Sequence, residues 1–213
     1  ASAQDHKRAY DNDEGPNTGG MGAVSPSRFE SDALREEIMR DIIQPVASGM
    51  AASGMPYRGI LYAGLMLTDS GPQVIEFNCR FGDPEAQVIL PRLQSDLLSA
   101  IYTVTEGGLK NFDMRWNSDS AVTVVMAANG YPGNYAKGSL INGADQLESP
   151  SGCLVFHAGT KRNNDGQLTA NGGRVLCITA MGATREQARK RAYAGVAEIT
   201  WEDGFYRSDI AAD

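Results

Sequence analysis

The chain has 213 residues, of which 42% are hydrophobic and 21% are charged, and its formal net charge is −7. This composition predicts a soluble globular protein that can hold one large domain or two small ones. The negative charge argues against a nucleic-acid-binding surface, because such a surface neutralises phosphates with Lys and Arg. No segment approaches the roughly 18 apolar residues of a membrane span, and the N-terminus does not resemble a signal peptide.

The three cysteines, Cys79, Cys153 and Cys177, are widely spaced, and with only two histidines they form no zinc pattern. We expect buried free thiols in a reducing compartment, and therefore a cytoplasmic location. The chain begins without Met and in loop-like sequence, so we also expect it to be a piece of a longer protein.

The first predicted elements are a loop and a helix. Residues 11–26 are rich in Gly, Asn, Asp, Pro and Ser, which predicts an ordered loop or disorder. A helix is predicted over 31–47, with Ser31 as its cap, apolar residues at four-residue spacing, and a bend near its end at Pro45. Residues 58–67 are an apolar, β-suited run that a turn at 69–72 joins to a second strand, so a hairpin with a buried first strand is expected.

The second strand of that hairpin, over 73–80, alternates between apolar and polar residues. Because successive side chains of a strand point to opposite faces, Glu76, Asn78 and Arg80 are predicted to share one face. Carboxylate and amide oxygens suit Mg²⁺, and a guanidinium suits phosphate or a developing oxyanion. This pattern favours phosphoryl chemistry, with an ordinary polar strand face as the alternative.

A helix is predicted directly after this strand. Asp83 can cap it and Pro84 suits its first turn, so the structural roles of cap for Asp83 and first-turn acid for Glu85 compete with functional ones. An interruption is expected at Pro91, and a second helix is expected from about Ser95.

The irregular residues 109–118 mark the expected boundary between two domains, 1–116 and 117–213. Strands are predicted over 121–128, 153–159 and 174–182, and a last helix begins after Thr184. The second domain is therefore expected to be a compact α+β module.

Cations lie beside a glycine-rich segment near the beginning of the chain. Asp5, His6, Lys7 and Arg8 precede the sequence GPNTGGMG at 15–22. Glycines let backbone N–H groups approach an anion closely, so a phosphate or carboxylate could bind here. No Gly-Lys-Ser/Thr follows, which excludes a Walker A motif. A plain surface loop is the alternative.

Several short sequence motifs, taken in their order along the chain, resemble those of the phosphoribosylamine–glycine ligase family. They are DHKR (5–8), GPNTGGMGA (15–23), EFNCRFGDPEAQ (76–87), GGRVL (172–176) and FYRSDI (205–210). The resemblance implies an α+β fold in which the C-terminal lobe of an ATP-grasp domain precedes a small C-terminal domain. It also implies an ATP-dependent reaction that joins glycine to 5-phosphoribosylamine through glycyl phosphate, giving glycinamide ribonucleotide, ADP and phosphate.

The resemblance implies roles for individual residues. Glu76 and Asn78 would hold Mg²⁺ or Mn²⁺, between which the sequence does not distinguish, and Arg80 and Asp83 would be catalytic. Arg174 would reach the sugar phosphate, unless it is only an arginine at the start of a strand. The residues that would line the substrate pocket are Asp5, His6, Lys7, Asn17, Thr18, Gly19, Gly20, Met21 and Gly22.

The chain departs from the family pattern because the N-terminal domain and the nucleotide-clamping lobe that such enzymes carry are absent. The implied partners are glycine, 5-phosphoribosylamine, ATP and the missing N-terminal half of the same enzyme. We expect little or no ligase activity from the isolated chain. Two alternatives remain open: another ATP-grasp carboxylate–amine ligase, and a non-catalytic module that binds a phosphate sugar.

Overall fold

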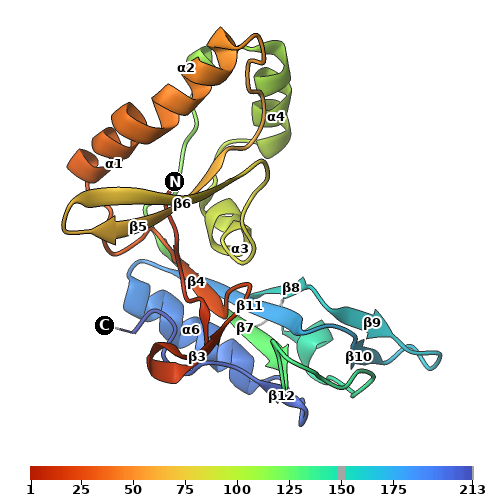
Figure 1. The fold of residues 1–213 in the computed structure, drawn as a ribbon. Coiled ribbons are helices and arrows are strands. Elements are labelled where there is room, and N and C mark those ends of the chain that lie inside the picture. The colour runs from red at the N-terminus through yellow and green to blue at the C-terminus, as the bar shows by residue number, and fades with distance from the viewer. Residues whose placement is uncertain (148–151, 213) are drawn as a thin grey trace. The chain divides into compact units, whose positions relative to one another are not determined.

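The computed structural model describes residues 1–147 and 152–212. The chain forms two compact units that interleave along the sequence, as the colours of Figure 1 show. Unit 1 contains Ala1–Ser27, Asp83–Arg92 and Asn117–Asp213, and unit 2 contains Arg28–Gly82 and Leu93–Trp116. The division into domains at 116/117 stays a prediction. No helix of the described residues is long and apolar enough to cross a membrane.

Unit 1 is built on a six-stranded antiparallel sheet. Its strands, in spatial order, are β1 (Gln4–Asp5), β4 (Gly22–Ser25), β7 (Ser120–Ala128), β11 (Arg174–Gly182) and β8 (Leu154–His157), while β12 (Gly204–Phe205) also pairs with β7. The predicted strands 121–128 and 174–182 are confirmed as β7 and β11, the central pair.

Helices cover both faces of this sheet. Ile178 of β11 packs in the main hydrophobic cluster with α6 (Arg185–Ala197), whereas Val88 of α3 (Ala86–Ile89) packs with Ala23 and Ala121 on the other face. Strands buried on both faces read as continuous apolar runs, which explains their sequences. The Thr123 and Thr179 hydroxyls lie 2.7 Å apart across β7 and β11, so this buried polar pair satisfies itself.

Two small ribbons complete unit 1. They are β2 (Arg8–Tyr10) with β3 (Glu14–Asn17), joined by the 3-10 turn Asp11–Asp13, and β9 (Thr160–Arg162) with β10 (Leu168–Ala170). The prediction of a loop or disorder over 11–26 is therefore wrong. Gly22 explains the difference, because a Cβ there would lie 2.7 Å from both Ile210 Cγ2 and the Thr123 carbonyl oxygen, so glycine lets β4 enter the sheet.

Unit 2 contains a long helix that is interrupted once. Helix α1 (Asp32–Ile38) continues through a π-helical stretch, Met39–Ile43, into α2 (Gln44–Ala52). The Ser31 hydroxyl caps α1, as predicted, by accepting a hydrogen bond from Leu34 N at 3.1 Å. The helix runs on to Ala52, beyond residue 47, and Pro45 follows directly on the π-helical stretch, where the hydrogen-bonding pattern of the helix already changes.

The rest of unit 2 is a hairpin and a second helix. Strands β5 (Tyr62–Thr68) and β6 (Gly71–Asn78) pair only with each other among the described residues. Helix α4 (Leu97–Glu106) ends at Gly107, whose φ of 76° suits glycine. The prediction that the first hairpin strand is buried is wrong, since Met66 is 55% exposed. Cys79 is likewise exposed, whereas Cys153 and Cys177 are buried free thiols.

Candidate functional site

The predicted metal ligands lie side by side on strand β6 of unit 2. Asn78 Nδ2 donates a hydrogen bond to Glu76 Oε1 at 3.1 Å, so the two side chains share a face, as predicted. Gly64 is the cross-strand partner of Glu76, and a Cβ at Gly64 would lie 3.1 Å from Glu76 Cγ. The glycine therefore leaves room beside the carboxylate.

The donor chemistry of this pair fits a hard divalent cation. A carboxylate and an amide oxygen are ligands that Mg²⁺ accepts, and Mg²⁺ is often held by one or two side chains plus substrate phosphates. No cluster of three or more His, Cys, Asp or Glu residues that could hold a metal occurs in the described part of the chain. Glu76 and Asn78 could thus hold an ion that substrate oxygens complete.

Arg80 does not continue the strand pattern. Strand β6 ends at Asn78, and the Arg80 guanidinium donates to the Phe81 carbonyl oxygen at 2.8 Å. The predicted strand over 73–80 therefore ends two residues early, and the position of Arg80 on the face of Glu76 and Asn78 stays a prediction. Its catalytic role stays a prediction.

In unit 1 the backbone brings the Asp5–Lys7 segment against the glycine-rich segment. His6 N donates to the Gly22 carbonyl at 3.0 Å, Met21 N to the His6 carbonyl at 2.8 Å, and Thr18 N to the Lys7 carbonyl at 2.8 Å. Segments that the sequence predicts to act together are thus paired residue by residue. Their roles as substrate-binding residues, including those of Asn17 and Gly19, stay predictions.

Asp5 is a buried carboxylate at the centre of this arrangement. Its side chain is 9% exposed and forms an ion pair with Lys7. Its Oδ1 has no hydrogen-bond partner in the described residues. Burial raises the pKa of Asp5 to about 6, an effect that Lys7 opposes and the nearby Glu85 reinforces. Gly20 packs over the carboxylate with φ +116°, and a Cβ there would lie 2.6 Å from Asp5 Oδ1.

Arg174 links the glycine-rich segment to Asp83, which lies in the loop after strand β6. Its Nη1 donates to the carbonyl oxygens of Gly19 at 2.8 Å and Asp83 at 2.9 Å, and its Nη2 donates to Asp83 Oδ2 at 2.9 Å. The guanidinium therefore fixes the loop conformation within unit 1. Contact between Arg174 and a sugar phosphate stays a prediction.

Asp83 is not a helix cap. Helix α3 is short, Glu85 occupies its N-cap position, and no side chain caps it. The other carboxylate oxygen of Asp83 accepts from Gln87 Nε2 at 2.9 Å, so Asp83 is held from two sides. Glu85, at the N-cap position of α3, is buried. Whether Asp83 takes part in catalysis stays a prediction.

Tyr131 is a residue of the site that the sequence reasoning missed. Gly19 N donates to the Tyr131 hydroxyl at 3.0 Å, and a Cβ at Gly173 would collide with the Tyr131 ring. Tyr131 and Arg174 thus hold both backbone polar groups of Gly19. The available signal was a tyrosine within the turn Asn-Gly-Tyr-Pro-Gly, directly after a buried strand.

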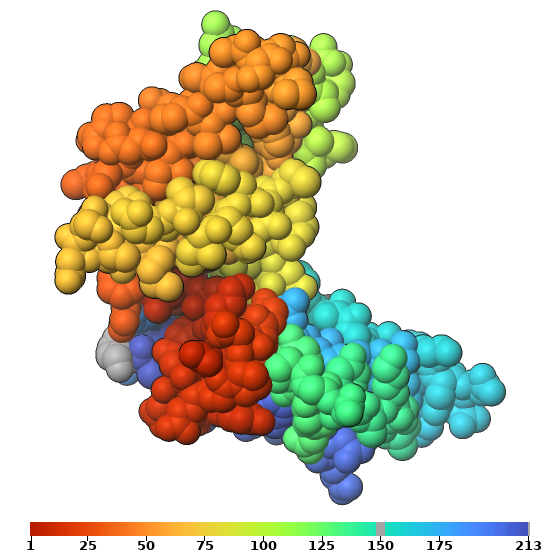
Figure 2. All heavy atoms as spheres, in the orientation of Figure 1, coloured from red at the N-terminus to blue at the C-terminus, as the bar shows by residue number. Residues whose placement is uncertain are grey.

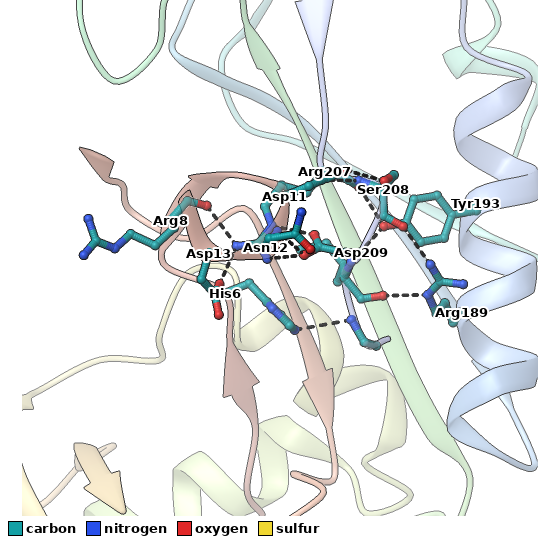
Figure 3. A network of polar contacts seen from close by, with 12 residues as sticks. His6, Arg8, Asp11, Asn12, Asp13, Arg189, Tyr193, Arg207, Ser208 and Asp209 are labelled. Carbon is teal, nitrogen blue, oxygen red and sulfur yellow. Dashed lines mark hydrogen bonds and ion pairs between the residues drawn. The ribbon is translucent and has the colours of Figure 1, made fainter. Parts of the chain in front are cut away.

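A second missed feature is an ionic network around Arg207, which Figure 3 shows in unit 1. The Arg207 side chain is 2% exposed. Its Nε and Nη2 each donate to the Asp209 carboxylate at 2.7 Å, and its Nη1 donates to Asp13 Oδ1 at 2.8 Å and to the Arg8 carbonyl at 3.1 Å. Hydrogen bonds from Arg207 lower the pKa of Asp209 to about 2. The FYRSDI motif therefore anchors the β2–β3 ribbon.

Further contacts extend this anchor to the candidate substrate segment. Ser208 N donates to Asp11 Oδ1 at 2.8 Å, and the Tyr193 hydroxyl of α6 donates to the Arg207 carbonyl at 2.6 Å. Ala211 N donates to His6 Nε2 at 3.3 Å (Figure 3). The last residues of the chain thus tie α6, the ribbon and His6 together.

Comparison with known proteins first identifies the class of protein to which these features belong. The ATP-grasp (A) domain model of phosphoribosylglycinamide synthetase matches residues 1–86. The C domain model of the same synthetase matches residues 121–213. The fold and the donor-bearing strand thus define an ATP-grasp protein. More narrowly, the chain belongs to the phosphoribosylglycinamide synthetase family.

Individual relatives agree with this assignment. The chain is 54% identical over 209 residues to the phosphoribosylamine–glycine ligase of Mesorhizobium japonicum, covering 98% of this chain and 49% of that protein. It is 52% identical to the ligase of Escherichia coli, covering 99% and 49%. The crystal structure of the Thermotoga maritima ligase superposes with a TM-score of 0.85 at 38% identity, covering 98% of this chain and 50% of that one. The chain thus spans about half the length of these relatives.

Proposed function

We propose that this chain is the C-terminal half of an ATP-dependent phosphoribosylamine–glycine ligase. The reaction transfers the γ-phosphoryl group of ATP to a carboxylate oxygen of glycine, releasing ADP. The amine of 5-phosphoribosylamine then attacks the carbonyl carbon of glycyl phosphate, phosphate leaves, the amine loses a proton, and glycinamide ribonucleotide forms. The observation that carries the proposal is the Glu76–Asn78 pair on β6, within a chain whose two matched domains belong to this synthetase.

Unit 2 contributes the metal-holding strand in this proposal. Glu76 and Asn78 would hold Mg²⁺ or Mn²⁺, and a bound ion would neutralise charge on the phosphate oxygens during transfer. Arg80 lies just beyond the strand, so its guanidinium can add positive charge there once it leaves the Phe81 carbonyl.

Unit 1 contributes the substrate segment. Lys7 and the backbone N–H groups of the glycine-rich residues 17–22 suit the anionic groups of glycine or the ribose phosphate. Asp5 and Asp83 flank this segment, and Arg174 and Tyr131 keep Gly19 in one conformation. Rigid support of this kind keeps reactive groups in position.

The proposed partner is the N-terminal half of the same enzyme, which would clamp ATP. Because the chain spans half of its relatives' length, a non-catalytic phosphate-sugar-binding module is the second candidate. Neither of these two candidate functions involves nucleic acid or a membrane. The buried thiols of Cys153 and Cys177 suit a reducing compartment, so a cytoplasmic location is part of the proposal.

The test is ADP release from ATP in the presence of Mg²⁺, glycine and 5-phosphoribosylamine. The 213-residue chain is assayed alone and with the part of the Mesorhizobium japonicum relative that it does not cover. We expect turnover only in the mixture, and its loss on Glu76→Gln, which keeps the side-chain size but removes the charge. Glu36→Gln, an exposed change on α1, is the matched control and leaves turnover unchanged.

Replacing glycine by other small carboxylic acids separates this ligase from a related one. ADP release that is indifferent to glycine would contradict the proposed substrate. A folded mixture without any ADP release, whose chain still binds ribose 5-phosphate, would favour the binding module.

A further inference from the structure

A pocket beside the β9–β10 ribbon of unit 1 lies outside the candidate site. Its volume is about 380 Å³, toward the lower end of the roughly 300–1,000 Å³ of small-molecule sites. In Figure 2 the ribbon belongs to the cyan part of the chain, next to the green segment that follows β7. We call this the ribbon pocket, and its lining includes Lys137, Lys161, Arg162, Asn164 and Asn171. None of the residues discussed above as substrate or metal ligands lines it.

Backbone hydrogen bonds hold the frame of the ribbon pocket. Gly138 N donates to the Ala170 carbonyl at 2.7 Å, and Ala170 N donates to the Ser139 carbonyl at 2.9 Å, so the segment that carries Gly138 runs along one edge of β10. Strand β9 pairs with the other edge, where Lys161 lies opposite Thr169. The Thr169 hydroxyl also donates to the Lys161 carbonyl at 2.8 Å. The lining residues therefore stand on a paired backbone on both sides of β10.

Two lysines line the pocket, one from each side of β10. Lys137 and Lys161 are both exposed, and neither has an ion-pair partner among the described residues. No Asp or Glu of the described residues lines the pocket, although acidic residues outnumber Lys and Arg in the chain by 26 to 19. Like charges that share one pocket repel each other. Their arrangement therefore indicates a place where a bound anion supplies the opposite charge.

The other lining groups indicate which kind of anion fits. Arg162 adds little net charge, because its Nη2 donates to Asp145 Oδ1 at 2.8 Å. The side-chain amides of Asn164 and Asn171 have no hydrogen-bond partner among the described residues, and an amide can both donate to and accept from a hydroxyl group. No aromatic or large apolar residue of the described chain lines the pocket, so it offers a nucleobase no surface for stacking.

We propose that the ribbon pocket is a second ligand site, which takes a phosphorylated sugar. Lys137 and Lys161 hold the phosphate group, and the amides of Asn164 and Asn171 contact the sugar hydroxyls. The proposal does not depend on the proposed function, because the pocket shares no residue with the candidate substrate segment or with the Glu76–Asn78 pair.

The test is an NMR titration of the 213-residue chain with ribose 5-phosphate at low salt, in which backbone amide shifts are followed residue by residue. We expect shifts at 137–138, 161–164 and 169–171. Combining Lys137→Gln with Lys161→Gln should raise the dissociation constant read at these residues at least about tenfold, because it removes both charge-assisted contacts to the phosphate. Both side chains are exposed, so the variant folds, and unchanged shifts in β7 and β11 verify this.

The matched control combines Lys110→Gln with Lys190→Gln. It removes the same two charges from exposed lysines outside the pocket, so it leaves the dissociation constant unchanged. Lys7→Gln separates this site from the candidate substrate segment, because it should affect only shifts at 17–22. Absence of shifts at the ribbon pocket, or equal affinity of the double lysine variant and the native chain, would overturn the proposal.

Three further probes test the class of ligand. Ribose 5-phosphate should bind at least about fivefold more tightly than inorganic phosphate or ribose, which is the gain from one net hydrogen bond. AMP should bind no more tightly than ribose 5-phosphate, because no ring in the pocket stacks on its base. Equal affinity for inorganic phosphate and ribose 5-phosphate would contradict a sugar ligand, and tighter binding of AMP would contradict it as well.

Discussion

The two units of this chain support their functional residues in different ways. In unit 1 the candidate substrate segment rests on a sheet that is buried on both faces, and the half-buried Arg174 and the buried Arg207 fix its loops. In unit 2 the candidate metal pair lies on a two-stranded hairpin, and most of the large exposed apolar residues of the described chain belong to this unit. The candidate binding loop is thus held by contacts within unit 1, whereas the candidate metal pair lies on strands that pair only with each other among the described residues.

The two tryptophans of the chain allow each unit to be followed separately. Trp201 is buried in unit 1, and Trp116 belongs to unit 2. With Trp116→Phe as the background, fluorescence reports on unit 1 alone, so each prediction below can be assigned to one unit.

Arg207→Met is the change expected to damage unit 1 most. Removing a buried cation leaves its carboxylate partners without a neutralising charge. This lowers the free energy of unfolding by about 3–5 kcal/mol when the carboxylates are fully buried. Asp209 is 25% exposed and Asp13 is 71% exposed, so we expect about 3 kcal/mol. Denaturant unfolding followed by Trp201 measures the loss. Arg162→Met, which breaks an exposed ion pair with Asp145, is the control and should cost less than about 1 kcal/mol.

If Arg207→Met and Arg162→Met cost the same, the network of Figure 3 does not stabilise unit 1. The pKa of Asp209 adds a second check. Because that pKa is lowered to about 2, its contribution is complete above about pH 4 and disappears as the pH falls toward 2. Arg207→Met should remove this acid dependence.

Asp5 is expected to give unit 1 the opposite pH dependence. Its pKa is raised from 3.8 to about 6, so between these values the folded state holds more protons than the unfolded state. The free energy of unfolding therefore falls as the pH rises from about 4 to 6, by about 2 kcal/mol. Asp5→Asn should flatten this part of the profile, whereas Asp165→Asn at the tip of the β9–β10 ribbon should not. An unchanged profile for Asp5→Asn would mean that the carboxyl is not desolvated.

Local sequence patterns predicted much of the fold. The caps Ser31 and Thr184, the central strands 121–128 and 174–182, and the pairing of Glu76 with Asn78 all follow from spacing within a few residues. The β2–β3 ribbon and the Arg207 network could not be predicted from such spacing, because Arg8 and Arg207 meet across almost the whole chain. The bulge at Ile75 was missed for a related reason, since it is visible only in the cross-strand register.

Tyr131→Phe is expected to loosen the glycine-rich segment without unfolding unit 1. The change removes only the hydroxyl that accepts from Gly19 N, a hydrogen bond worth about 1 kcal/mol. Hydrogen exchange at Gly19 should accelerate several-fold, while exchange in β7 and β11 stays slow. Tyr135→Phe is the control. Tyr135 packs edge-on against Tyr131, but Gly19 N donates to the Tyr131 hydroxyl and not to that of Tyr135. Equal acceleration in both variants would mean that the Tyr131 hydroxyl does not specifically hold Gly19.

The smallest effects come from removing one helix cap in each unit, and they compare the units most directly. Ser31 caps α1 by accepting from Leu34 N at 3.1 Å, and Thr184 caps α6 by accepting from Gln187 N at 3.2 Å. Each substitution by Ala should cost about 1 kcal/mol. Because α6 packs on the sheet, Thr184→Ala should lower the stability that Trp201 reports. Ser31→Ala should leave that signal unchanged and accelerate exchange only in α1, because neither hydrophobic cluster of the described residues includes a residue of α1. A fall in the Trp201 signal on Ser31→Ala would show that the two units unfold together.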